Sequence, residues 1–291
     1  MLKNSGFDSI ETYLDFYDLK FAAVRYEFMP FKSNGFELAG HIFRHANYKA
    51  TVVILHGYLN HCGLLSKLIE FLLEADFAVA CFDLPGHGLS AGTPADIEDF
   101  SQYTQALADF MNFVKPKLHS PYHLIGHSTG GSCTIDYLLT ENGKDFDRII
   151  LATPLIHSIF WNTSKIVYKF CHLFSKQIPR VFRRNSSDKD FLQFVKYKDP
   201  LQARKLPLQW IKALYNWNDK IVNAEVCDKS ILIIQGKADS TVDYKFNIRF
   251  LQSKFPDTQI KLLENARHEL FNESREIHQE VFRCIKDWLD K

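Results

Sequence analysis

Apolar and polar positions alternate in two ways along this chain. Short runs of mainly Val, Ile, Leu and Phe are typical of buried strands, while longer stretches with an apolar residue every three or four positions are typical of helices. The strand-like runs are residues 51–55, 78–82, 122–125, 148–151, 230–234 and 259–263. The helical stretches lie near residues 64–75, 97–118, 128–140, 244–254 and 274–290. Their alternation predicts an α/β fold with a mostly parallel sheet flanked by helices.

The first part of the chain has a different pattern. Two further strands are expected over residues 19–28 and 36–43, on either side of the segment KSNG at 32–35. An Asn-Gly pair between such runs is typical of a tight turn that joins antiparallel strands. The pattern therefore predicts an eight-stranded sheet whose first two strands are antiparallel.

The regular spacing of strands is interrupted once, where about eighty residues separate Leu151 from Ser230. Such a stretch is too long for an ordinary loop, and it carries helical apolar patterns of its own. We therefore expect an inserted helical cap, or lid, over residues 155–225. The α/β core is then formed by residues 1–154 and 226–291.

The composition is that of a folded globular domain. Hydrophobic residues make up 46% and charged residues 24%, and the formal charge is +1, which gives no indication of a nucleic-acid partner. A basic start followed by an apolar run is missing, as is a stretch long enough to span a bilayer, so we expect a cytoplasmic protein. Six cysteines without a CxxC pair are expected to be reduced, and we expect no metal or cofactor. They are Cys62, Cys81, Cys133, Cys171, Cys227 and Cys284.

A candidate nucleophile lies between the strand at 122–125 and the helix at 128–140. The residues from Gly126 to Gly130 read GHSTG and match the G-x-S-x-G pattern, in which a serine sits on a sharp strand-to-helix turn. Glycines on both sides avoid clashes at that turn, and the following helix supplies free N–H groups where negative charge develops. Ser128 is the expected nucleophile.

A serine hydroxyl needs an imidazole to accept its proton and a carboxylate to orient that imidazole. In this kind of fold the order along the chain is serine, then acid, then histidine. Asp239 follows the strand at 230–234, and His268 follows the strand at 259–263. Sites of such sheets form at the carboxyl ends of the strands, so Asp239 and His268 are the expected acid and base.

Other residues of the right type compete for these roles. His278 falls inside the last helical stretch, which favours a surface position. Asp243 lies four residues after Asp239, and Asp228 precedes its strand and is expected at the opposite end of it.

An oxyanion formed on the substrate needs two N–H donors. One is usually the amide after the nucleophile, which is that of Thr129 here, and the other comes from the loop after an earlier strand. The strand at 51–55 is followed by His-Gly-Tyr, so the amide of Tyr58 is the expected second donor. The alternative interpretation is that His-Gly-Tyr is only a turn.

Three blocks of sequence resemble a known family. They are His-Gly with a following histidine at His61, D-x-x-G-H-G-x-S over Asp83–Ser90, and G-H-S-x-G-G over Gly126–Gly131. Together with GKADSTVD and ARHEL they resemble the monoacylglycerol lipase and lysophospholipase branch of the α/β hydrolases, also called serine aminopeptidase-like hydrolases. This resemblance implies the α/β-hydrolase fold and cleavage of acyl esters, of the monoacylglycerol or lysophospholipid type, through an acyl-enzyme on Ser128.

Some positions depart from the family pattern. The pair Leu-Asn at 59–60 stands where the family commonly has Gly-Glu, Pro85 replaces an arginine, and Thr129 replaces a methionine. None of these departures changes Ser128, Asp239 or His268. The loop that carries residues 59–60 borders the acyl site, so the departures weaken a strict assignment of monoacylglycerol as the substrate. Asp83 and His87 resemble structural loop residues of the family and are not expected to be catalytic.

Other activities on the same scaffold stay open. A peptidase or a thioesterase would use the same triad, and a binding protein with little turnover would keep the fold. Epoxide hydrolases and haloalkane dehalogenases need an aspartate as nucleophile, which Ser128 excludes.

The expected cap is strongly basic. It has thirteen Lys or Arg and five Asp or Glu, a net charge of about +8, while the rest of the chain is about −7. Cations mixed with aromatic residues suit peripheral contact with an anionic membrane surface; the alternative is that the aromatic residues face the core and the lysines are solvated. The aromatic residues are Phe160, Trp161, Tyr168, Phe170, Phe174, Phe182, Trp210, Tyr215 and Trp217. The expected partner at the active site is a small-molecule acyl ester.

Overall fold

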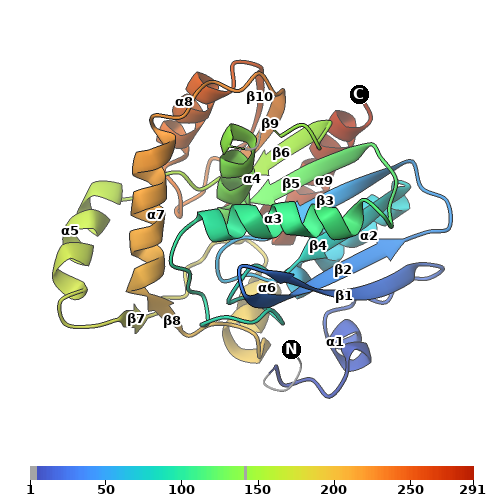
Figure 1. Cartoon of the computed structure of the whole chain (residues 1–291), viewed down its shortest axis with the longest axis horizontal. Coiled ribbons are helices and arrows are strands. Elements are labelled where there is room, and N and C mark those ends of the chain that lie inside the picture. The colour runs from blue at the N-terminus through green and yellow to red at the C-terminus, as the bar shows by residue number, and fades with distance from the viewer. Residues whose placement is uncertain (1–4, 141–142) are drawn as a thin grey trace.

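The computed structural model describes residues 5–140 and 143–291. Within them, an eight-stranded sheet has the order β1-β2-β4-β3-β5-β6-β9-β10 (Figure 1). Strand β2 is antiparallel to both of its neighbours, and the remaining pairs are parallel. This mostly parallel sheet confirms the expected architecture. The strands are β1 (Arg25–Ser33), β2 (Phe36–Arg44), β3 (Ala50–Leu55), β4 (Phe77–Phe82), β5 (Tyr122–His127), β6 (Arg148–Ala152), β9 (Ile231–Gly236) and β10 (Thr258–Leu263).

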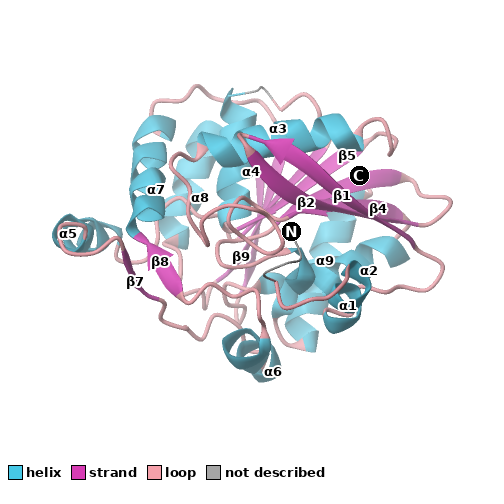
Figure 2. Cartoon of the chain, turned by 60° about the horizontal axis from the view of Figure 1, so that its bottom comes forward, coloured by secondary structure: helices cyan, strands magenta, loops and turns pink. Residues whose placement is uncertain are grey.

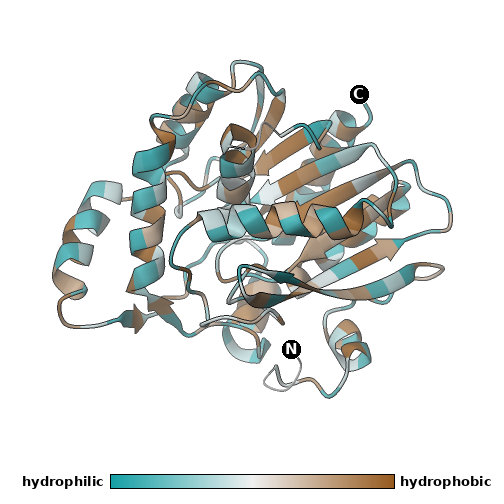
Figure 3. Ribbon diagram, in the orientation of Figure 1, coloured by the Kyte–Doolittle hydropathy of each residue, from teal (hydrophilic) through white to brown (hydrophobic). Residues whose placement is uncertain are grey.

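Helices cover both faces of the sheet because its central strands are apolar on both sides (Figure 3). On β3, Val53 and Leu55 belong to one hydrophobic cluster, and Val52 and Ile54 to the other. One face is covered by α3 (Ser101–Val114), α4 (Thr129–Thr140) and α8 (Tyr244–Lys254). The other is covered by α2 (Ser66–Glu74), α9 (Arg275–Leu289) and an N-terminal helix that the sequence pattern did not predict, α1 (Ile10–Phe16).

Strand β1 begins and ends later than the expected range of 19–28. Asp18 and Ala23 have φ angles of 52° and 58°, so the chain before Arg25 turns and is not extended. Asn34 and Gly35, at 49° and 78°, form the expected two-residue turn. The prediction of the hairpin was correct, and the position of its first strand was wrong.

The segment of residues 155–225, here called the inserted segment, lies between β6 and β9. It contains helices and a short antiparallel sheet of two strands that the apolar pattern did not predict. Figure 2 shows α5 at the outside of this segment, beyond α7. The elements are α5 (Trp161–Cys171), β7 (Gln177–Pro179), α6 (Lys189–Gln193), the π-helical turn η3 (Phe194–Lys198), β8 (Lys205–Pro207) and α7 (Leu208–Ile221).

The aromatic residues of the inserted segment divide into two groups. Trp161, Trp210, Tyr215 and Trp217 are buried, whereas those on and around the outer face of α5, such as Phe174, are exposed. The four buried residues face the core, as one of the two interpretations made from the sequence expected, and contact of the exposed ones with a membrane stays a prediction. Across the described residues, none of the helices has the length and apolar character needed to span a membrane.

Candidate active site

Ser128 occupies the tight turn between β5 and α4, with a φ of 50°. The turn is crowded by backbone atoms. A Cβ on Gly130 would lie 2.3 Å from the carbonyl oxygen of Leu55, and a Cβ on Gly126 would lie 2.6 Å from the carbonyl oxygen of Gly130. Only glycine fits at these two positions, which explains the G-x-S-x-G spacing.

The structure brings Ser128, His268 and Asp239 together. His268 Nε2 lies 2.9 Å from Ser128 Oγ, and His268 Nδ1 lies 2.8 Å from Asp239 Oδ2. Asp239 and His268 follow the carboxyl ends of β9 and β10, the positions that the sequence predicted for them. Because the carboxylate accepts a hydrogen bond from Nδ1–H, Nε2 carries no proton and can accept the one of Ser128.

The electrostatics of the pair favour a charged carboxylate and a basic imidazole. Burial alone raises the pKa of the Asp239 carboxyl, but the charge of His268 and hydrogen bonds, including one from Thr241 N–H at 2.7 Å, bring this pKa below its usual value. Burial lowers the pKa of His268, yet the charge and hydrogen bond of Asp239, with the charge of Glu269, raise it above 6.5. Asp239 thereby makes the imidazole of His268 more basic.

The competing residues lie elsewhere or have another role. His278 is on α9, and its Nδ1 donates a hydrogen bond to the Glu273 carbonyl oxygen at 3.0 Å. Asp243 caps the N-terminus of α8, and Asp228 precedes β9. None of the three contacts Ser128 or His268 among the described hydrogen bonds.

The amides of Tyr58 and Thr129 are free to donate. Within residues 5–140 and 143–291, neither amide has a hydrogen-bond partner. The Tyr58 hydroxyl donates to the Ala95 carbonyl oxygen at 2.8 Å, and its ring stacks on Trp210 of the inserted segment at 3.6 Å. The loop after β3 is thus held on both sides.

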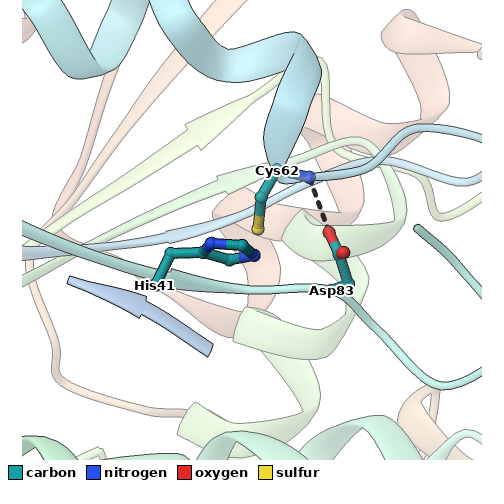
Figure 4. Close-up of side chains that lie close together, drawn as sticks. All are labelled: His41, Cys62 and Asp83. Atoms are coloured by element: carbon teal, nitrogen blue, oxygen red, sulfur yellow. Dashed lines mark hydrogen bonds between the residues drawn. The ribbon is translucent and has the colours of Figure 1, made fainter. Parts of the chain in front are cut away.

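A buried carboxylate anchors the end of the same loop. Asp83 accepts hydrogen bonds from the amides of Cys62 and Leu89, both at 2.7 Å, and Figure 4 shows the first of them. Ligand atoms of His41, Cys62 and Asp83 lie within 4.8 Å of one another, a spacing that could hold a metal ion. Because both Asp83 oxygens already bind backbone amides, we interpret this cluster as a structural anchor, which agrees with the role expected from the sequence.

Several residues at the site were missed by the sequence reasoning. His127 Nε2 donates to the His268 carbonyl oxygen at 3.0 Å. The Glu269 carboxylate accepts from Asn60 Nδ2 at 3.0 Å and from Asn185 Nδ2 at 3.2 Å. In the sequence, His127 occupies the first variable position of G-x-S-x-G, and Glu269 directly follows His268. Neither position indicates a role without the structure.

A cavity of about 720 Å³ opens above Ser128 and His268. Its wall is formed largely by apolar side chains of the inserted segment, including Ile178, Leu206 and Leu214. The charged residues in its lining are Arg180, Arg183, Arg184, Lys189, Lys196 and Glu269. The arrangement can place an apolar chain beside the serine and a polar group near the charges.

The comparisons with known proteins agree with this geometry. The family model described as serine aminopeptidase, S33, matches residues 46–275. A monoglyceride lipase of Rattus norvegicus is 27% identical over 257 residues, which cover 83% of this chain and 82% of that protein. A phospholipase of Bacillus subtilis is 24% identical over 256 residues, covering 83% and 95%.

Solved structures share the fold of this chain. A soluble variant of the monoglyceride lipase of Saccharomyces cerevisiae, in complex with a substrate analogue, has a TM-score of 0.77 at 20% identity and covers 93% of this chain and 96% of that one. A thermostable carboxyl esterase of Bacillus coagulans has a TM-score of 0.73 at 21% identity, with 91% and 98% covered. The fold is therefore shared with enzymes of differing sequence.

Proposed function

Since this chain belongs to the serine aminopeptidase, S33, family of hydrolases, in its monoacylglycerol lipase-like branch, we propose that it cleaves carboxylic esters of acyl lipids with Ser128 as nucleophile. One observation carries the proposal. The Ser128 hydroxyl donates a hydrogen bond to His268 Nε2, and His268 Nδ1 donates one to Asp239 Oδ2, so the three residues form an unbroken chain that opens on a mainly apolar cavity.

The proposed reaction has two halves. Ser128 Oγ attacks the carbonyl carbon of the ester while its proton passes to His268 Nε2, and the same proton then passes to the leaving alcohol oxygen as the ester bond breaks. The acyl group stays on Ser128 as an ester. Water then attacks this acyl-enzyme, gives a proton to His268 and releases the fatty acid, and the proton returns to Ser128.

The two unpaired amides supply the oxyanion hole in this proposal. Tyr58 N–H and Thr129 N–H would bind the carbonyl oxygen as it becomes negative. The helix α4 begins at Thr129, so its N-terminal partial charge adds to the stabilisation. Each donor of this kind contributes about a hundredfold to a thousandfold in rate.

The inserted segment is proposed to act as a lid that selects the substrate. Its side chains form most of the apolar wall of the cavity, which suits a chain of carbon atoms. Relatives whose names state an activity on monoglycerides or phospholipids support an acyl ester with a polar head.

Contact with a membrane is proposed through α5 and the turn after it. Ile166, Phe170 and Phe174 are exposed there, beside Lys169 and Lys176. Apolar side chains flanked by lysines suit the interface of a bilayer with anionic headgroups. Such contact would bring the opening of the cavity to its lipid substrate.

The central proposal is tested with a fluorophosphonate probe and a series of p-nitrophenyl esters of increasing acyl length. We expect labelling of the wild type and none of Ser128→Ala, with a loss of ester turnover of at least about a thousandfold. Rates should rise from short to medium acyl chains because the cavity wall is apolar. Failure of folded wild type to react with the probe or with any ester would contradict the proposal.

A further inference from the structure

Arg180 lies in the wall of the cavity that contains Ser128 and His268. It follows β7, and its guanidinium lies 4.3 Å from the centre of the Phe182 ring. Its Nη1 donates hydrogen bonds to Gln202 Oε1 and to the Ala203 carbonyl oxygen, the latter at 3.2 Å. These contacts hold the guanidinium in one orientation.

The positive charge of Arg180 has no direct counter-charge. In the described part of the chain, no carboxylate lies within ion-pair distance of the guanidinium. Burial lowers its pKa to about 10, although the charges of Glu269 and Asp199, neither of which forms an ion pair with the guanidinium, act in the opposite direction. Removing a cation from water without a partner costs free energy, so a group in this state is suited to receive an anion.

The side chains around Arg180 leave part of the guanidinium available. Asp199 Oδ2 accepts a hydrogen bond from Gln202 Nε2 at 2.8 Å, which turns the amide oxygen of Gln202 toward Arg180 Nη1. Over residues 5–140 and 143–291, Arg180 Nε and Nη2 make no hydrogen bond. Two adjacent N–H donors of one guanidinium match two oxygens of a phosphate group.

The other charged residues of the lining strengthen the positive potential. None of the four further cations in the lining forms an ion pair with a described carboxylate. They are Arg183, Arg184, Lys189 and Lys196. The only acidic residue among the described lining residues is Glu269, whose oxygens already accept hydrogen bonds from Asn60 and Asn185. Among the described lining residues, five cations therefore stand against one carboxylate.

We propose that Arg180 binds the phosphate of a single-chain phospholipid, so that the substrate is a lysophospholipid and not a neutral monoacylglycerol. This inference rests on the proposed ester hydrolysis and names its substrate class. A glycerol head would leave the guanidinium without a counter-charge, whereas a phosphate neutralises it. The apolar wall then holds the acyl chain, and the ester lies at Ser128 between the two.

The test compares substrates that share one oleoyl chain: monooleoylglycerol, lysophosphatidic acid and lysophosphatidylcholine. We expect the wild type to have a higher kcat/KM for the two phosphate-bearing lipids. In Arg180→Gln, the ratio of kcat/KM for phosphate-bearing to neutral substrate should fall by about tenfold to a hundredfold, mainly through KM. Arg180→Lys should lose less, because it keeps the charge but not the paired donors.

Arg204 provides a matched control. Its guanidinium lies 5.3 Å from the same Phe182 ring, but Arg204 is not part of the cavity lining. Arg204→Gln should therefore leave the substrate ratio unchanged. An equal loss on all three lipids in Arg180→Gln, or an equal change of the ratio in Arg204→Gln, would overturn the proposal.

Binding to Ser128→Ala tests the phosphate site without turnover. We expect calorimetry to give at least tenfold tighter binding of lysophosphatidic acid than of monooleoylglycerol, and the preference should be lost when Arg180→Gln is added. Inorganic phosphate that binds as tightly as lysophosphatidic acid would instead assign a site for free phosphate and overturn the lipid assignment. If this binding preference is found but no ester is cleaved, the hydrolase proposal fails and the phosphate site stands.

Discussion

His61 Nε2 donates a hydrogen bond of 3.0 Å to Asp199 Oδ2 and so joins the loop after β3 to the inserted segment. The orientation of the imidazole is defined, because its Nδ1 accepts a hydrogen bond from the amide of Gly63. Both side chains are buried, and Asp199 Oδ1 also accepts from the Tyr17 hydroxyl at 2.7 Å. Since the same loop carries Tyr58, the inserted segment holds the proposed oxyanion donor in place.

Replacement of Asp199 should therefore weaken both folding and catalysis. We expect Asp199→Ala to lower the free energy of unfolding by about 3–5 kcal/mol, because the partners of a buried acid are left unpaired. In protein that remains folded, kcat for p-nitrophenyl butyrate should fall about tenfold as the loop loosens. Urea unfolding and steady-state kinetics measure the two effects.

Tyr17→Phe is the control for this variant, because it removes one hydrogen bond to Asp199 but keeps the ring that packs on His61 and the His61–Asp199 hydrogen bond. It should cost about 1 kcal/mol of stability and leave kcat unchanged. If kcat is the same in folded Asp199→Ala and in the wild type, the contact between His61 and Asp199 is not needed to hold the loop that carries Tyr58.

The same carboxylate predicts a pH dependence of stability. Burial raises the pKa of Asp199, but its electrostatic interaction with His61 and the hydrogen bonds of His61, Tyr17 and Gln202 lower it more, to about 2. The folded pKa is thus below the unfolded value of about 3.9, so the stabilisation is complete above about pH 5 and is lost as pH falls toward 2. The difference in unfolding free energy between wild type and Asp199→Asn should shrink by about 2–3 kcal/mol over that interval. A difference that stays constant with pH would show that the ionised Asp199 carboxylate does not stabilise the fold.

The activity should depend on pH through His268. The imidazole must be neutral to accept the proton of Ser128, and its pKa is raised above 6.5, so kcat/KM should fall as pH drops through an inflection above that value. Asp239→Asn should lower kcat about 10⁴-fold and move the inflection to lower pH.

Glu269→Gln should move the same inflection in the same direction by a smaller amount, since Glu269 contributes less to the rise than Asp239. Asp243→Asn, at the cap of α8, should leave the pH profile unchanged. An inflection that stays in place in Glu269→Gln would remove that carboxylate from the electrostatics of the base.

Gly130 should tolerate no side chain. Its Cβ would lie 2.3 Å from the Leu55 carbonyl oxygen and 2.7 Å from that of His56, where backbone on both sides prevents relaxation. Gly130→Ala is expected to lower the free energy of unfolding by about 3 kcal/mol or more. Gly35 has a φ of +78°, but a Cβ there would meet open space. Gly35→Ala should therefore lower the free energy of unfolding by only about 1 kcal/mol. Equal losses in chemical denaturation would contradict the steric explanation.

The exposed residues of the inserted segment should bind anionic vesicles. Phe170 and Phe174 are 65% and 88% exposed. Replacing both by serine is expected to weaken binding to phosphatidylserine-containing vesicles at least tenfold in a sedimentation assay, because each buried ring contributes about 2 kcal/mol. Phe113→Ser, on α3, should bind like the wild type, and salt should weaken binding by the wild type. Vesicle binding by the double variant equal to that of the wild type would exclude this surface.

Much of the architecture could be predicted from local patterns. The apolar runs that become β3 to β6 and the periodic stretches that become α2, α3, α4, α8 and α9 are visible because strands and helices expose different faces at a fixed repeat. Ser128 was recognisable because a tight turn needs glycine at set positions, and Asp239 and His268 because they follow two strands. The expected start of β1 was wrong because left-handed turns at Asp18 and Ala23 carry no apolar signal.

The sequence by itself therefore determined the sheet, its flanking helices and the three residues proposed for the chemistry. Only the tertiary structure decided which polar side chains meet. Asn60 and Glu269 are 209 residues apart, and His61 and Asp199 are 138 apart. Arg180, from the inserted segment, lines the same cavity as Asn60 and Glu269. The physical reason is that local periodicity reports how each element is buried, whereas contacts between polar groups depend on how separate elements pack against one another.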